Sequence, residues 1–122
     1  MPQSNKSLGT SFERELAHVL SKLGYWCKVF NTGTGQPCDV IAVKENCAYF
    51  LECKTAKGDI FPTARIEANQ HEFYRFSASK GNTNCFIAVR FKSGIKIFHF
   101  SDIVSGTKTL RFEKGLDFED VF

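Results

Sequence analysis

The chain of 122 residues predicts an α/β fold whose elements follow the order helix, three strands, helix, two strands. Apolar residues recur at helical spacing in residues 11–23 and, more weakly, in 66–77. Short runs rich in β-branched and aromatic residues alternate with turn-forming sequences, which is typical of strands. A hydrophobic content of 43% supplies enough apolar material for one core, so we expect a single domain over residues 1–122.

The first half of the chain leads into a predicted hairpin. The apolar residues within 11–23 predict a helix that ends before Gly24, and residues 25–30 are predicted to form a strand. The following loop contains Thr32-Gly-Thr-Gly35, which lacks the Gly-Lys-Ser/Thr ending of a phosphate loop. Residues 40–43 and 48–51 then form two apolar runs joined by a tight turn.

The register of this hairpin decides which side chains meet. A two-residue loop at Glu45-Asn46, or a four-residue loop, places Ile41 opposite Phe50 and Asp39 opposite Glu52. A three-residue loop shifts the register by one residue and sends Asp39 to the other face. In the favoured register, Lys54 shares the face of Glu52 because side chains alternate along a strand.

Two carboxylates and an ammonium at the end of a hairpin favour a metal site. A solvated ladder of charges is the alternative, but both faces of the hairpin read as apolar, which predicts a sheet covered on both sides. Adjacent carboxylates repel unless a cation lies between them. Mg²⁺ is bound by one or two carboxylates together with water and phosphate oxygens. We therefore expect Asp39 and Glu52 to bind Mg²⁺ or Mn²⁺.

The second half of the chain supplies the remaining elements. We expect a loop over residues 55–62, a helix over 66–77, and a second hairpin from 84–91 and 95–100, followed by a short helix or turn at 101–104. Residues 107–122 stay unassigned, with three alternatives: packing on the domain, contact with a second subunit, or mobility.

Composition excludes several classes of protein. No apolar run reaches the roughly 20 residues of a membrane span, and the N-terminus lacks a signal peptide, so we expect a cytoplasmic location. Five cysteines without a Cys-x-x-Cys pair indicate neither a disulfide framework nor a zinc knuckle, and most are expected in the core. A net charge of +3 is only weak evidence for a nucleic acid partner.

Other polar residues are weaker candidates when taken alone. Glu13 is expected in the first turn of the first helix, where a favourable interaction with the helix dipole explains it. Gln70 falls on the inward stripe of the second helix, so its amide needs a hydrogen-bond partner, which a site group can supply. The three histidines show no metal-ligand spacing and receive no role.

Together, these residues resemble a known superfamily. The Gly9-x-x-Phe-Glu13 helix, Asp39, Glu52-x-Lys54 and a later helix with Gln70 are similar to the PD-(D/E)xK nucleases, and within them to Holliday junction resolvases of the archaeal Hjc and bacterial RecU types. The resemblance covers about residues 7–105. Cys38 separates Pro37 from Asp39, and the stalk-forming insertion of RecU is absent.

The resemblance implies a restriction-endonuclease-like core with a central mixed five-stranded sheet flanked by helices. It implies a homodimer that resolves four-way DNA junctions by paired hydrolysis in a bacterial, archaeal or phage-infected cytoplasm. The Cys53 carbonyl becomes a possible third metal ligand, and Glu13 completes the site or holds a metal-bound water. Lys54 orients the attacking water or stabilises the transition state, and Gln70 aligns water or phosphate.

Several residues are candidates for contacts with DNA phosphates, which would make binding fall with salt. These candidates are Lys6, Ser11, Lys57, Arg65, Lys80, Arg90 and Lys92. Two other functions stay open: a nuclease of the same fold that acts on other DNA, such as a restriction or repair enzyme, and a non-catalytic DNA-binding module. The intact Asp39, Glu52 and Lys54 argue against the module.

Overall fold

The computed structural model describes residues 5–30 and 38–122, with the side chains of the first helix from Ser11 onward. Its elements, in chain order, are α1 (Asn5–Lys22), β1 (Trp26–Val29), β2 (Val40–Lys44), β3 (Cys47–Thr55), β4 (Ile60–Pro62), η1 (Thr63–Arg65), α2 (Ala68–Ser79), β5 (Cys85–Phe91), β6 (Gly94–His99), α3 (Phe100–Val104), β7 (Thr109–Arg111), η2 (Phe112–Lys114) and α4 (Phe118–Val121).

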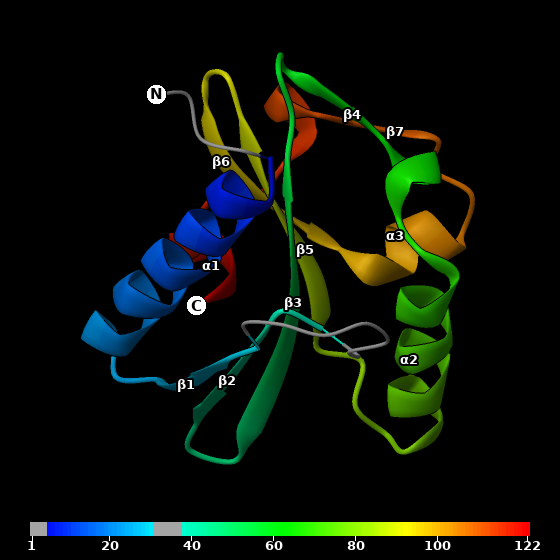
Figure 1. Cartoon of the computed structure of the whole chain (residues 1–122). Coiled ribbons are helices and arrows are strands. Elements are labelled where there is room, and N and C mark those ends of the chain that lie inside the picture. Colours follow the sequence, from blue (N-terminus) through cyan, green and yellow to red (C-terminus); the bar gives the residue numbers. More distant parts are fainter. Residues whose placement is uncertain (1–4, 31–37) are drawn as a thin grey trace.

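A five-stranded sheet in the order β1-β2-β3-β5-β6 crosses the centre of the molecule (Figure 1). β3 and β5 are parallel, and the other three neighbouring pairs are antiparallel. The predicted mixed five-stranded sheet flanked by helices is therefore confirmed. The carboxyl ends of the two parallel strands lie at the same edge, where functional sites of open α/β sheets commonly form.

The β2–β3 hairpin has the predicted register. Lys44 pairs with Cys47 and Ile41 with Phe50, so the loop is the two-residue turn Glu45-Asn46. Glu45 adopts a left-handed φ of 56°, a backbone conformation that short hairpin turns require. The pairing continues to Asp39, whose N–H donates to the Leu51 carbonyl at 3.0 Å. Asp39 and Glu52 consequently stand on one face of the sheet.

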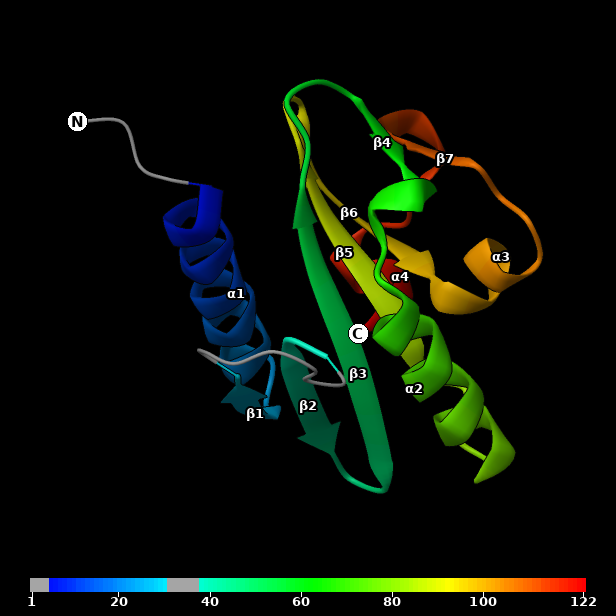
Figure 2. The same cartoon turned by 45° about the vertical axis from the view of Figure 1, so that its right-hand side comes forward.

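Each face of the sheet carries its own hydrophobic core. On one face, the buried residues of α1 pack on β2, β3 and β5 together with the C-terminal residues Phe118 and Phe122. On the other face, a second core joins β5 and β6 to Phe61 of β4, Phe100 of α3 and Leu110 of β7, with Tyr74 of α2 packed against it. Figures 1 and 2 show α1 on the opposite side of the sheet from α2 and α3. The face of α2 is the one that carries Glu52.

The loop expected over residues 55–62 is wrong in part. β3 continues through Thr55, and Ile60–Pro62 forms β4, which pairs with β7 in a separate two-stranded sheet. Three residues are too few to show the alternation that indicates a strand, and β7, which pairs with β4, is remote in sequence. The C-terminal segment packs on the domain: the Phe122 ring lies 5.6 Å from that of Tyr25 and 5.4 Å from that of Tyr49.

The helix boundaries also differ from the expected ones. α1 begins at Asn5 instead of residue 11, because a helix can start on polar residues that carry no apolar periodicity. Glu13 therefore lies mid-helix, and the helix-dipole explanation for it is wrong. α2 spans Ala68–Ser79 instead of 66–77, since Ile66 is buried just before the helix. No helix among the described residues is long and apolar enough to span a bilayer.

Candidate active site

Asp39 and Glu52 form the centre of the candidate site. Asp39 immediately precedes β2, and its Oδ2 accepts a hydrogen bond of 2.8 Å from the Cys53 backbone N–H. Glu52 lies within β3, 4% exposed, and its carboxyl group shares a hydrogen bond with that of Asp39. The hairpin register therefore brings the buried carboxyl group of Glu52 into contact with the partly buried one of Asp39.

Burial and mutual repulsion hold a proton on this pair. Desolvation, followed by the hydrogen bond and charge of Asp39, raises the pKa of Glu52 from 4.5 to about 10. Desolvation and the charge of Asp39 also raise the pKa of Glu13 to about 7, so Glu13 of α1 faces the same centre. A cation between the carboxylates would reverse both effects.

Lys54 supplies the positive charge of the site. Its Nζ lies 3.9 Å from Glu52 Oε1, and its charge lowers the pKa of both Glu52 and Glu13. Lys54 is two residues beyond Glu52 on β3, so strand alternation places both on one face. The structure thus brings together Asp39, Glu52 and Lys54, as the hairpin pattern predicts, and Glu13, as the family resemblance implies.

Gln70 reaches the site from α2 but has an unexpected partner. Its Oε1 accepts a hydrogen bond of 3.0 Å from the Glu67 backbone N–H, and the Glu67 side chain accepts from the Gln70 backbone N–H. This reciprocal pair is a capping box at the start of α2. Gln70 and Glu52 line the same small cavity, with a volume of about 10 Å³.

Glu67 is the residue that sequence reasoning missed. Its charge contributes to raising the pKa of Glu52, so it lies within electrostatic reach of the carboxyl pair. The available signal was the spacing Glu67-x-x-Gln70, which matches a capping box except that Glu replaces the usual Ser or Thr. That substitution makes the pattern easy to overlook.

The donor set suits a hard divalent cation. No three Asp, Glu, His or Cys side chains within residues 5–30 and 38–122 converge as a complete metal cage. Mg²⁺ does not require one, because it keeps several waters and uses one or two carboxylates plus substrate phosphates. A buried Glu52 carboxyl group that is costly to ionise without a cation, beside the carboxyl group of Asp39, matches this preference.

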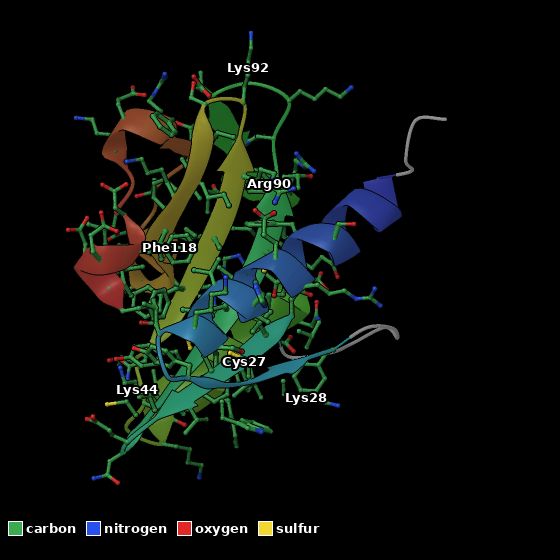
Figure 3. All side chains as sticks on the ribbon, turned by 90° about the vertical axis from the view of Figure 1, so that its left-hand side faces the viewer. Cys27, Lys28, Lys44, Arg90, Lys92 and Phe118 are labelled. Atoms are coloured by element: carbon green, nitrogen blue, oxygen red, sulfur yellow. The ribbon has the colours of Figure 1, made fainter. Side chains whose placement is uncertain are left out.

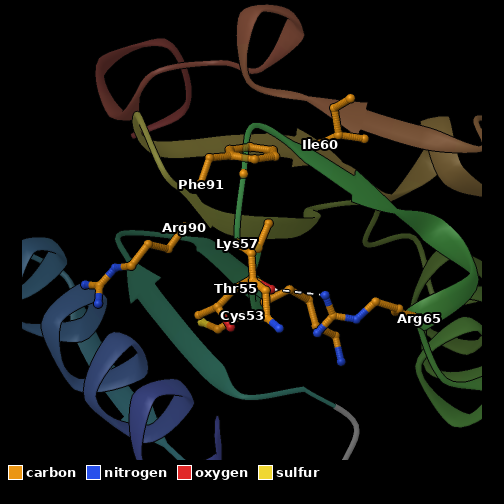
Figure 4. Close-up of a pocket in the computed structure, with 10 residues that line it drawn as sticks. Cys53, Thr55, Lys57, Ile60, Arg65, Arg90 and Phe91 are labelled. Carbon is orange, nitrogen blue, oxygen red and sulfur yellow. Dashed lines mark hydrogen bonds between the residues drawn. The ribbon is translucent and has the colours of Figure 1, made fainter. Parts of the chain in front are cut away.

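A basic cleft of about 760 Å³ opens next to the carboxyl pair, at the carboxyl ends of β3 and β5. Lys54 belongs to its lining and so connects the cleft to the site. Figure 4 shows Lys57, Arg65 and Arg90 around it, with the β4 segment forming one wall. All the charged side chains that line it are cationic, which suits a polyanion.

Two of the arginines are held in place. The Arg65 guanidinium donates to the Thr55 carbonyl at 3.2 Å and lies 4.8 Å from the Phe61 ring centre (Figure 4). Arg90 forms an ion pair with Glu15 of α1 and stacks 4.7 Å from the Phe12 ring centre. Figure 3 shows Arg90 beside α1. Lys57 is exposed on the β3–β4 loop.

The other predicted DNA contacts lie elsewhere. Lys80 follows the C-terminal end of α2, where it lies 5.5 Å from the Phe76 ring, outside the cleft lining. Ser11 is exposed on α1 and is not part of the lining either. Lys92 lies on the β5–β6 turn (Figure 3), and its backbone N–H donates to the Gly58 carbonyl. The Lys6 side chain and the Thr32-Gly-Thr-Gly35 loop lie outside the described residues.

The thiols are accounted for by packing. Cys38, Cys53 and Cys85 are buried, Cys27 is half-buried, and Cys47 is exposed, so the expected burial of most cysteines is confirmed. Burial raises the pKa of the Cys53 thiol well above its ordinary value. Only the main chain of Cys53 is suited to a polar role in the site.

Comparisons with known proteins identify a matching family and similar folds. Residues 4–122 match the family model described as archaeal Holliday junction resolvase (Hjc). The solved structure of Hjc from Archaeoglobus fulgidus is similar, with 21% identity, a TM-score of 0.71, and coverage of 92% of this chain and 96% of that one. The bacterial homing endonuclease I-Ssp6803I shares 13% identity at a TM-score of 0.57, over 90% of this chain and 75% of the other. No curated protein sequence matches the chain.

Proposed function

The chain belongs to the archaeal Holliday junction resolvase family Hjc, and we propose that Asp39 and Glu52 form its catalytic centre with Mg²⁺ or Mn²⁺. The family are nucleases that hydrolyse DNA, and their substrate is the branched DNA of a four-way junction. The observation that carries the proposal is the buried contact between the two carboxyl groups beside Lys54. Two cores on opposite faces of one sheet support the proposal of a single nuclease domain over residues 1–122.

Asp39 and Glu52 would hold the cation, with the Cys53 carbonyl as a further oxygen ligand. When bound, the ion would make water more acidic and offset charge developing on the scissile phosphate. The hydrogen bond from the Cys53 N–H fixes Asp39 Oδ2 and leaves Oδ1 for the cation. Glu52 must lose its proton to bind, so we expect cation affinity to rise with pH.

Lys54 and Glu13 would act on the groups that react. The Lys54 ammonium, close to Glu52, would orient the attacking water or stabilise negative charge on the phosphate. Glu13 has a pKa of about 7, so it exchanges a proton readily at neutral pH. It would accept a proton from water at the centre or hold a metal-bound water.

The basic cleft would guide a DNA strand to this centre. Lys57, Arg65 and Arg90 would contact phosphates, and Lys54 at the inner end of the cleft would meet the scissile phosphate. Arg65 and Arg90 are already stacked on phenylalanine rings, so they lose little side-chain freedom on binding.

We further propose a homodimer, which would present two such sites to opposed strands of a junction. Trp26 and Phe76 support it, because they are large aromatic side chains that are 63% and 60% exposed. The register of β1 puts Trp26 on the face that carries Glu52, and α2, which bears Phe76, packs on that face through Phe73 and Phe50. A two-fold contact there would cover both rings.

The decisive experiment uses a labelled four-way junction and a linear duplex of matching sequence, incubated with Mg²⁺, Mn²⁺ or EDTA. We expect symmetric nicks in the junction only, dependent on the cation and lost in Glu52→Gln. Cleavage of both substrates would support the proposed catalytic centre but show that the protein is a nuclease that also acts on other DNA. Tight binding of the junction without cleavage under any cation would favour a non-catalytic module.

The dimer has its own test in light scattering. Trp26→Ser and Phe76→Ser should each lower the measured mass toward that of one chain. Val104→Ser is the matched control, since Val104 is an exposed apolar residue on α3. A wild-type mass of one chain at micromolar concentration, with or without junction DNA, would overturn the dimer.

A further inference from the structure

The capping box at the start of α2 decides which end of the Gln70 amide faces the carboxyl pair. The Glu67 backbone N–H can only donate, so the Gln70 atom 3.0 Å away must be the oxygen. The amide nitrogen is then the remaining end of the group. Gln70 is 8% exposed, so that nitrogen has little solvent to turn to.

The surroundings of Gln70 indicate what its nitrogen can reach. Glu52 and Gln70 line one cavity of about 10 Å³, which is on the scale of a single water molecule and far too small for a nucleotide. The residues that line the basic cleft include Lys54 and Arg65 but not Gln70. Gln70 is therefore placed to act on Glu52, and not on a phosphate in the cleft.

We infer that Gln70 is a positioning residue for Glu52, oriented by the Glu67 backbone, and that its amide nitrogen donates to the Glu52 carboxylate when the site holds a divalent cation. The inference rests on the proposed function, because it assigns a partner to one of the proposed ligands. A single hydrogen bond from the Gln70 amide nitrogen to one oxygen of Glu52 would fix the plane of the carboxylate and stabilise its ionised form. The role expected from family resemblance, alignment of water or phosphate, is replaced by an indirect one.

The test measures Mn²⁺ binding calorimetrically without DNA, together with thermal unfolding. Gln70→Met keeps the volume of the side chain and removes both the donor and the acceptor. We expect its Mn²⁺ affinity to fall about 10-fold, at the lower end of the effect of removing a partner of a metal ligand. Junction binding in EDTA should stay unchanged, because Gln70 would not touch DNA.

The role of the Glu67 backbone is tested by a matched pair of variants. Glu67→Ala and Glu67→Pro both delete the side chain, but only proline also removes the N–H that holds the amide. Glu67 has a φ of −78°, and Ile66 before it is extended at a ψ of 130°, so proline fits this backbone. We expect Glu67→Pro to bind Mn²⁺ about 3-fold more weakly than Glu67→Ala.

The outcomes separate this inference from the proposed function. If wild-type protein binds Mn²⁺ but Gln70→Met binds it equally well, the positioning role is wrong and the catalytic centre stands. If Gln70→Met instead weakens junction binding in EDTA, Gln70 contacts DNA and the inference is overturned. If wild-type protein and Glu52→Gln both fail to bind Mn²⁺, the proposed centre itself fails. A Gln70→Met variant with wild-type unfolding temperature shows that an affinity loss is not a folding defect.

Discussion

The carboxyl pair and the basic cleft adjoin each other but are built in opposite ways. Asp39 and Glu52 are fixed by a hairpin, and Glu52 is buried with a pKa raised to about 10, so it keeps its proton at neutral pH. Lys57, Arg65 and Arg90 come from a loop, a 3-10 helix and a strand; Lys57 and Arg65 are exposed, and Arg90 is half-buried. The difference matches the roles that we propose, with the pair carrying the chemical step and the cleft attracting DNA phosphates.

This difference predicts separable defects. Buried charges carry large energies because water cannot screen them, whereas exposed cations contribute a modest, salt-dependent attraction. Substitutions in the pair should therefore change the chemical step and the stability. Substitutions in the cleft should change DNA affinity and its response to salt.

The largest effect is expected from Asp39→Asn. Asparagine keeps an oxygen that can accept from the Cys53 N–H but cannot provide an anionic ligand, so the cleavage rate should fall on the order of 1000-fold. Single-turnover cleavage of a labelled junction measures this loss. Junction affinity in EDTA serves as the control and should stay within about 3-fold of wild type. A cleavage rate within tenfold of wild type would show that Asp39 is not part of the catalytic centre.

The next effect is on affinity. Replacing Lys57 and Arg65 together by glutamine should weaken junction binding, and the slope of log Kd against log salt concentration should fall by about 2, roughly one unit per lost phosphate contact. Binding in EDTA over a salt series measures the slope. Lys80→Gln is the control, since Lys80 lies beyond the far end of α2. An equal loss in the control would mean that the cleft has no special role.

The pair should also limit the stability of the metal-free protein. Because the folded pKa of Glu52 is raised from 4.5 to about 10, the folded state keeps a proton that the unfolded chain releases above pH 4.5. Stability therefore falls as pH rises from about 4.5 toward 10. Glu52→Gln, which never ionises, should be more stable at pH 7 in EDTA by roughly 1–3 kcal/mol, with no gain at pH 4.

Urea unfolding at the two pH values checks this gain. Glu72→Gln on the exposed side of α2 is the control and should change stability at neither pH. A destabilised Glu52→Gln at pH 7 would show that Glu52 is ionised and well paired in the folded state.

The smallest effect is expected at Glu15, which forms an ion pair with Arg90 of the cleft lining. Its ion pair with Arg90 is partly exposed, so Glu15→Gln should change stability by less than about 1 kcal/mol. Freeing Arg90 for a phosphate should tighten junction binding by up to about 3-fold. The gain should vanish when Arg90→Gln is added to the variant. Weaker binding by Glu15→Gln would mean that the ion pair holds Arg90 in its binding position.

Local pattern was sufficient for the hairpin and for three members of the site. The turn Glu45-Asn46 sets the register, the register aligns Asp39 with Glu52, and alternation adds Lys54. The resemblance to a nuclease family added Glu13, which periodicity alone misplaced in the first turn of a helix. Asp39, Glu52 and Lys54 were predictable because the short-range geometry of one hairpin fixes them.

Features that depend on distant contacts were not predictable. β4 exists because Ile60–Pro62 pairs with Thr109–Arg111, and no local signal connects these segments. Lys80 carries the same charge as Lys57, but α2 carries it away from the cleft.

The sequence by itself determined the α/β order, the hairpin register and the residues of the carboxyl pair, because all three follow from spacing along the chain. Only the tertiary structure decided the burial that raises the pKa of Glu52 and the set of cations that line one cleft. These properties depend on what packs against each side chain. Packing joins residues that are remote in sequence, so it cannot be derived from their spacing.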